Sequence, residues 1–180
     1  GTPINELTIS LDQGWNLISG ISETTNLSAI SDPGEIIIPG TVYGFTGTYS
    51  AASELSPGQG YWINANADGD VTISSGSSAR IITSFSDRTK EANRLSFGGS
   101  DLYFGVSIPE QEMSSYQLPP KPPEGTFDVR FKDGWKAVKD YGEVEVMGTT
   151  ETLTITYAIQ INAGNQYNWV LSSERGDHIL

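Results

Sequence analysis

The sequence has no cysteine, one histidine and few basic residues. It carries 10 Lys and Arg against 22 Asp and Glu, a formal net charge of −12 at pH 7. Without cysteine, neither a disulfide nor a thiolate metal site can form. The negative charge repels phosphate, which argues against binding to nucleic acid or to an anionic membrane surface.

Long apolar runs are also missing, and the histidine is poorly placed for chemistry. No run approaches the roughly 18 apolar residues of a membrane-spanning helix, so we expect no membrane insertion. The histidine, His178, is the third residue from the end of the sequence. A Ser-His-Asp triad needs a positioned imidazole, and a zinc site needs several His or Cys ligands. We therefore expect neither histidine-dependent catalysis nor a zinc centre.

The remaining composition is that of a globular β-protein. Hydrophobic residues make up 37% of the chain and 20 residues are glycine, which is enough apolar material for a packed core. Charged residues amount to only 18%, and small polar residues that favour strands and turns take their place. We expect an all-β fold with helix below about 10% of the residues, well under the usual share.

In the first half, alternating apolar residues predict strands, and turn sequences predict hairpins between them. Residues 7–11 and residues 15–18 have the two-residue period of half-buried strands. The turn at residues 12–14 predicts that these two strands form a β-hairpin. Asp68-Gly69 predicts a hairpin between residues 61–63 and 71–73, and Gly47 marks a third.

The second half has the same signature over a longer stretch. Alternation predicts strands at residues 104–108, 127–131, 143–146 and 153–161, and a hairpin turn at residues 162–165. Six or seven strands at this short spacing are typical of an antiparallel β-sandwich of the immunoglobulin-like kind.

The stretch between the two halves is the most linker-like part of the chain. Residues 74–80 are small and mostly polar without apolar periodicity, so they cannot bury a face. We predict a junction between Ser74 and Leu95, with one short helix possible at residues 87–95. The chain is thus expected to hold two tandem antiparallel β-sandwich-like modules, residues 1–80 and residues 81–180.

A proline-rich stretch interrupts the second half. Residues 118–125 contain four prolines, which fix φ near about −65° and remove four backbone donors. Two interpretations follow: a proline-rich ligand motif, or a stiff cross-over loop over the edge of the sandwich.

Several of these segments resemble known bacterial modules. Gly14-Trp-Asn-Leu-Ile-Ser19 and Pro57-Gly-Gln-Gly-Tyr-Trp-Ile63 resemble a small β-module of large secreted or surface proteins. Phe104-Gly105, Leu118-Pro-Pro120 and Phe127-Asp-Val-Arg-Phe131 are similar to a module often found upstream of a type IX secretion sorting domain. The resemblance implies an extracellular or cell-surface location and neighbouring domains in a parent chain. It implies no activity and no functional residues.

Acidic and amide side chains give two further candidates. Paired carboxylates serve glycosidases, but the pairs considered, Glu110 with Glu112 and Glu143 with Glu145, are expected on solvated strand or loop faces. A calcium loop places oxygen ligands at alternate positions with glycine at the sixth. The matching residues are Asn64, Asn66, Asp68 and Asp70, with Gly69 at the sixth position. An Asp-Gly turn explains the same letters, and no other cofactor is expected.

The aromatic residues are the remaining candidates for ligand binding. Trp15, Trp62 and Trp169 lie in strand patterns and are expected in the core. Trp135 lies in a charged turn with Tyr141 six residues on, and loops at the end of a sandwich carry binding residues. These two residues form the predicted glycan site, with packing of Trp135 over the core as the alternative.

Two functions remain after these exclusions, and neither is enzymatic. One is a non-catalytic accessory region of a secreted protein that binds polysaccharide and holds an attached enzyme near its substrate. The other is a structural spacer that supports display or secretion of a neighbouring domain. An exposed coplanar pair of aromatic rings would favour the first function, and burial of the tryptophans would favour the second.

Overall fold

The computed structural model describes residues 1–76, 85–148, 152–160 and 168–174, and these residues form strands and four short 3-10 helices. In the first half the strands are β1 (Glu6–Leu11), β2 (Gly14–Ser19), β3 (Thr25–Asn26), β4 (Ile30–Ser31), β5 (Ile37–Phe45), β6 (Tyr49–Ala51), β7 (Glu54–Leu55), β8 (Gly60–Ala65) and β9 (Gly69–Ser74). In the second half they are β10 (Asn93–Phe97), β11 (Ser100–Phe104), β12 (Asp128–Phe131), β13 (Ala137–Val138), β14 (Val144–Met147) and β15 (Ile155–Ala158). The helices are η1 (Leu27–Ala29), η2 (Arg88–Glu91), η3 (Glu110–Tyr116) and η4 (Lys132–Gly134). The all-β prediction is confirmed.

The first half (residues 1–76) is built from sheets that share one core. The sheets have the strand orders β1-β9-β4, β2-β8-β5-β6 and β3-β7. Alternate residues of the first two sheets meet in a single buried cluster, which is where the two-residue period of the strands places them. Its members include Leu11, Ile30, Val42, Leu55, Tyr61, Ile63, Val71 and Ile73.

The second half (residues 85–174) has its own sheets and its own core. The sheets have the orders β13-β11-β10-β15 and β12-β14, and their buried residues are Leu95, Phe97, Leu102, Phe104, Val129 and Phe131. All pairings are antiparallel except that of β11 with β13. A parallel pair requires a long cross-over connection, and the chain between these strands supplies one through η3 and β12.

Two of the predicted hairpins are wrong, because the strands at each turn belong to different sheets. β1 pairs with β9 and β2 pairs with β8, so residues 12–14 and Asp68-Gly69 form corners between sheets. The two corners bind each other: the backbone N–H of Gln13 donates to Asp68 Oδ1 at 2.7 Å. The hairpin around Gly47, between β5 and β6, is confirmed.

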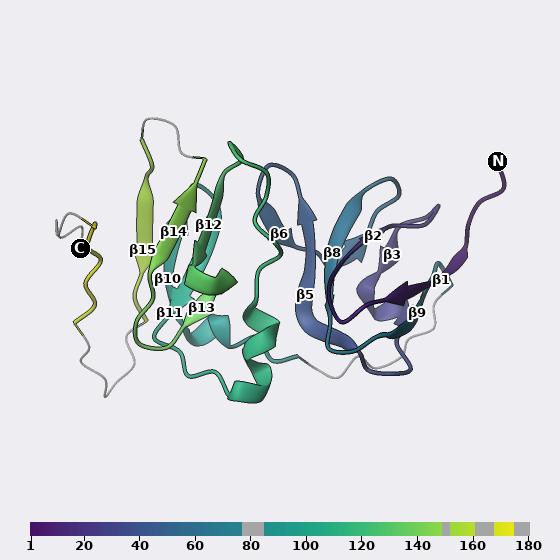
Figure 1. Cartoon of the computed structure of the whole chain (residues 1–180), viewed down its shortest axis with the longest axis horizontal. Coiled ribbons are helices and arrows are strands. Elements are labelled where there is room, and N and C mark those ends of the chain that lie inside the picture. Colours follow the sequence, from purple (N-terminus) through teal and green to yellow (C-terminus); the bar gives the residue numbers. More distant parts are fainter. Residues whose placement is uncertain (77–84, 149–151, 161–167, 175–180) are drawn as a thin grey trace.

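The described residues of the two halves lie side by side along the long axis of the molecule (Figure 1). No strand pairing between described residues crosses from one half to the other. The helix expected near residues 87–95 is present as η2, and the side chain of Asp87 caps it by accepting from the backbone N–H of Thr89. The hairpin at residues 162–165, Ile161 and His178 lie outside the described residues, as does much of the predicted linker. None of the described helices is long and apolar enough to cross a membrane.

Candidate functional site

The sheet β2-β8-β5-β6 presents a second, aromatic face away from the first core. Residues directly opposite one another in a sheet point to the same side, and Trp15 is opposite Asn64, while Trp62 is opposite both Leu17 and Tyr43. Ile63, between Trp62 and Asn64, is in the core. We use the name aromatic face for five residues of this outward side: Trp15, Tyr43, Tyr49, Trp62 and Asn64.

Residues of the second half cover much of the aromatic face. Asn64 Nδ2 donates to Gln117 Oε1 at 3.2 Å, and the hydroxyl of Tyr49 donates to the carbonyl of Pro120 at 3.0 Å. The Nζ of Lys136 lies 5.6 Å from the centre of the Tyr43 ring, within the range of a cation–π contact. Together these contacts form a junction between the halves.

The pairing of β5 with β8 shifts register between Ile37 and Val42, and Gly40 in this stretch makes a further contact of the junction. Gly40 has φ of +78°, and a Cβ added there would lie 2.8 Å from the Phe85 ring. The positive φ and the close approach both require glycine. The Phe85 ring in turn packs 5.9 Å from that of Tyr116 in η3.

Burial in the junction changes the protonation of its polar groups. Burial lowers the pKa of Lys136, while Asp87 and Tyr116 act in the opposite direction. Burial also raises the pKa of Tyr43, and Asp87 raises it further. The Tyr43 side chain is 3% exposed, and its hydroxyl has no hydrogen-bond partner among the described residues. The junction therefore holds a neutral tyrosine and a desolvated lysine in contact.

The proline-rich stretch runs through this junction and contacts both halves. We call residues 118–123 the proline strap. Its carbonyl at Pro119 accepts from Arg130 Nη1 at 2.8 Å, and its carbonyl at Pro120 accepts from Tyr49 of the first half. Lys121 pairs with Glu145 at 2.8 Å. The strap is thus a connection, as one interpretation predicted, but it lies between the halves and not over an outer edge.

Arg130 is held in place by a buried ion pair. Its Nε and Nη2 donate to the two carboxylate oxygens of Asp128 at 2.6 and 3.0 Å. Arg130 and Asp128 alternate with the core residues Val129 and Phe131, yet their own side chains are only 3% and 6% exposed. The strap and η4 cover this side of β12, which explains the burial.

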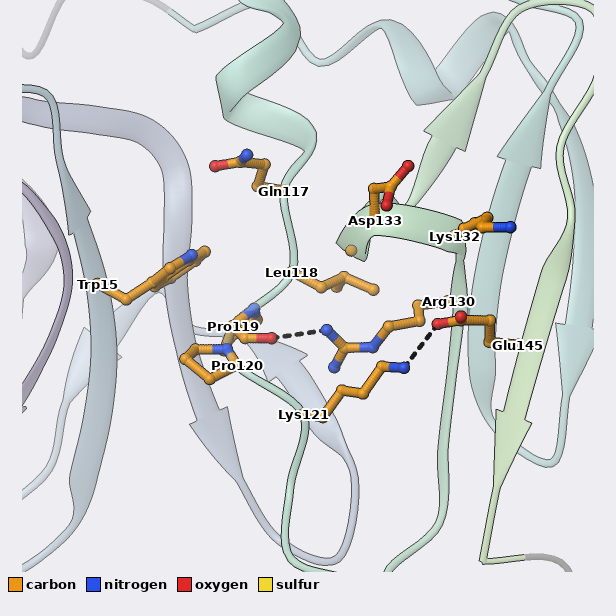
Figure 2. Close-up of a pocket in the computed structure, with 11 residues that line it drawn as sticks. Trp15, Gln117, Leu118, Pro119, Pro120, Lys121, Arg130, Lys132, Asp133 and Glu145 are labelled. Atoms are coloured by element: carbon orange, nitrogen blue, oxygen red, sulfur yellow. Dashed lines mark hydrogen bonds and ion pairs between the residues drawn. The ribbon is translucent and has the colours of Figure 1, made fainter.

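A groove of about 360 Å³ opens at the end of the junction. Figure 2 shows Trp15 on one wall, with the proline strap and Arg130 opposite. Its full lining is Trp15, Gln117, Leu118, Pro119, Pro120, Lys121, Arg130, Lys132, Asp133, Gly134 and Glu145. The three cations of the lining all form ion pairs. Arg130 pairs with the buried Asp128, Lys121 pairs with Glu145, and Lys132 pairs with Glu143. This groove is the candidate ligand site of the molecule.

The two residues of the predicted glycan site have different environments. Trp135 is half-buried and packs against the second core, whereas Tyr141 is 85% exposed. Trp135 follows a tight turn in which Asp133 and Gly134 both have positive φ. The contact of Trp135 with the core is the packing alternative raised from the sequence, and the glycan site at these two residues stays a prediction.

The residues of the predicted calcium loop each have a protein partner. Asn64 bonds Gln117, Asn66 donates to the carbonyl of Glu35, and Asp70 accepts from Ser10 at 2.6 Å. Asp68 receives the N–H of the neighbouring corner, as described above. Within the described ranges, no group of three or more Asp, Glu, His or Cys is placed to hold a metal ion. The contacts of these four side chains are complete without a calcium ion, and calcium binding stays a prediction.

Three of the four carboxylates considered for catalysis form ion pairs. Glu112 pairs with Arg88 at 2.6 Å, and Glu143 pairs with Lys132 at 3.0 Å. The hydrogen bond from Arg88 lowers the pKa of Glu112, and that from Lys121 lowers the pKa of Glu145. A general acid needs a raised carboxyl pKa, so these two are in the wrong electrostatic setting for that role.

The groove is lined by none of the residues predicted as a glycan or calcium site, and Trp15 and Gln117 are among the lining residues that were missed. Trp15 was expected in the core, but it lies on the opposite side of its sheet. A signal was present in β8, which has large side chains at both parities, as in a sheet covered on both faces. Gln117 carried no comparable signal, because it follows a short helix in an irregular segment.

Comparisons with known proteins add no relative to this picture. No protein-family model matches the chain. No curated protein and no solved structure matches it either.

Proposed function

We propose that this chain is a non-catalytic accessory region of a secreted, multidomain bacterial protein. In this proposal residues 1–80 and 81–180 are two β-sandwich-like modules, the second immunoglobulin-like, and the pair acts as a stiff spacer for a neighbouring domain. Two separate cores support the division into modules. The resemblance of the Gly-Trp-Asn and Pro-Gly-Gln-Gly-Tyr-Trp motifs supports the extracellular setting.

The observation that carries the proposal is the covered aromatic face. Domains in one chain move freely by default unless their interface is large and apolar. Here aromatic rings, the proline strap and a desolvated lysine fill the interface. Separating the halves would expose these rings to water, at roughly 25 cal/mol for each Å² of apolar surface. A junction of this kind favours a fixed angle between the modules.

Polysaccharide binding is the second candidate function. All four tryptophans are half-buried, which favours the spacer over an exposed aromatic platform. The groove beside Trp15 is the observation that favours a ligand.

Distance measurements between spin labels test the spacer. The chain has no native cysteine, so Glu54→Cys in β7 and Thr156→Cys in β15, both at exposed positions, place one label on each half. Double electron–electron resonance on the full chain is expected to give one narrow distance distribution. A broad distribution in this unperturbed chain would overturn the proposal.

A charge reversal in the junction provides the matched comparison. Lys136→Glu places a carboxylate beside the Tyr43 ring and near Asp87, and is expected to broaden the distribution. Lys90→Glu changes the net charge equally at an exposed position in η2 and should leave it narrow. Turnover of a polysaccharide, peptide or ester panel that is lost on substituting one carboxylate would contradict the non-catalytic assignment.

A further inference from the structure

We propose that the junction groove binds a neutral saccharide, with one sugar ring stacked on the indole of Trp15. This site is different from the one predicted at Trp135 and Tyr141. The inference goes beyond the spacer function, and either proposal can fail without the other.

Trp15 has the placement that a stacking residue requires. It lies on β2, an edge strand of its sheet, and Figure 2 shows its side chain reaching toward the proline strap. The Tyr43 ring packs against it at 6.1 Å and a tilt of 57°, which fixes the indole from the protein side. Its indole N–H has no hydrogen-bond partner among the described residues, in contrast to Trp62, which bonds Tyr49. The ring is therefore held in place and half-buried, and its indole N–H is an unpaired donor among the described residues.

Polar groups without partners lie around the same groove. The side-chain oxygen of Gln117 accepts from Asn64, so both amide hydrogens of Gln117 remain available. The carboxylate of Asp133 forms no hydrogen bond or ion pair with the described residues, and it can accept hydroxyl protons. Sugar hydroxyls both donate and accept, so they match this mixture. An apolar ligand would bury these groups unpaired, at a cost that disfavours it.

The charges of the groove point to a neutral ligand. Arg130 is neutralised by Asp128, Lys121 by Glu145 and Lys132 by Glu143. Asp133 is then the charge left over, and the chain as a whole carries −12. Phosphate, sulfate or uronic acid groups would be repelled. The groove volume of about 360 Å³ lies at the lower end of the roughly 300–1,000 Å³ of ligand sites, which suits one short saccharide segment.

The test uses the full chain and neutral carbohydrates. A glycan array of neutral oligosaccharides and pull-down on insoluble neutral polysaccharides identify a binder, and calorimetry then gives its Kd. Trp15→Ala is expected to weaken binding about 30-fold or more, as loss of a central aromatic anchor does. Trp15→Phe should retain part of the affinity, because a smaller aromatic ring still stacks.

Two further variants keep the result decisive if Trp15→Ala does not fold. Gln117→Glu retains the oxygen that accepts from Asn64 but removes the free amide donors, and should weaken binding about tenfold. Tyr141→Ala, on the exposed residue of the alternative site, should leave Kd unchanged.

Three outcomes would overturn the inference. The first is an unsubstituted chain that binds no neutral glycan. The second is unchanged binding in a folded Trp15→Ala or Gln117→Glu variant. The third is loss of binding in Tyr141→Ala alone, which would return the site to Trp135 and Tyr141. None of these outcomes alters the spin-label distances that test the spacer.

Discussion

Tyr43 and Tyr49 both lie on the aromatic face, but only one of the two hydroxyls has a partner. The Tyr49 hydroxyl donates to the proline strap, whereas that of Tyr43 is buried and unpaired among the described residues. We predict that Tyr43→Phe raises the free energy of unfolding by about 1 kcal/mol, because a desolvated hydroxyl is removed. Tyr49→Phe should lower it by roughly 0.5–1.5 kcal/mol. Urea unfolding followed by tryptophan fluorescence measures both, and equal losses would mean that Tyr43 has an unseen partner.

Single tryptophans show how far the sequence predicts a residue's role. Trp15 and Trp62 were assigned to strands correctly, because strand period and aromatic content are local properties. The predicted side of the sheet was wrong, because neighbours such as Tyr61 and Trp62 are both large aromatic residues. The alternation alone does not say which of the two faces the first core. The second half covers the side of the sheet that carries Trp15 and Trp62. This contact depends on residues more than fifty positions away in the sequence, such as Gln117.

At the scale of the element, the proline strap depends on β12. Arg130 connects them, since it binds both Asp128 and the carbonyl of Pro119. We predict that Arg130→Met lowers the free energy of unfolding by about 3–5 kcal/mol, because Asp128 is left as a buried unpaired charge. Adding Asp128→Asn should recover much of that loss, since the remaining group is neutral. If urea unfolding gives the same stability for the single and the double variant, burial of the lone charge is not the cause.

Strand positions were more predictable than strand partners. The period of two identifies residues 7–11, 15–18 and 71–73 as strands, and β1, β2 and β9 include them. The same period does not indicate which strands pair with each other, so the turns beside Gly14 and Gly69 were mistaken for hairpins. The hydrogen bond from Gln13 to Asp68 joins the two corners between the sheets. Because these residues are far apart in the sequence, a prediction from each turn alone does not include this contact.

For the molecule as a whole, we predict loss of stability at alkaline pH. Burial raises the pKa of Tyr43, Tyr49, Tyr103 and Tyr116, so the folded state retains protons that the unfolded state releases above about pH 10. Their contribution is complete below about pH 10 and is lost as the pH rises through the raised values. Lys136 acts oppositely, because its lowered pKa makes its contribution grow toward about pH 10.4.

The four tyrosines outnumber the one lysine, so the net slope above about pH 10 should be downward. Urea unfolding at a series of pH values from 8 to about 11 measures it. Tyr43→Phe should make the slope shallower. A free energy of unfolding that stays level or increases above about pH 10 would contradict the assignment.

The proposed division of the chain rests on a local sequence property, whereas the contacts between the halves do not. The polar stretch at residues 74–80 marks where apolar periodicity stops, and this is a local property. Docking depends on complementarity between surfaces, here Tyr43 with Lys136 and Tyr49 with Pro120. Tyr43, Tyr49 and Lys136 are not unusual in their own segments, and the proline-rich stretch around Pro120 did not indicate which surface it contacts.

The separation of the strand ladders into two halves has a mechanical consequence. β1 and β15 lie at opposite ends of the long axis, so a pulling force along that axis passes through both halves in series (Figure 1). Within each half, ladders of backbone hydrogen bonds and a buried core hold the strands together. Across the junction only side chains and the strap carry the load among the described residues. Tension would therefore open the junction first and lengthen the molecule while both cores stay folded.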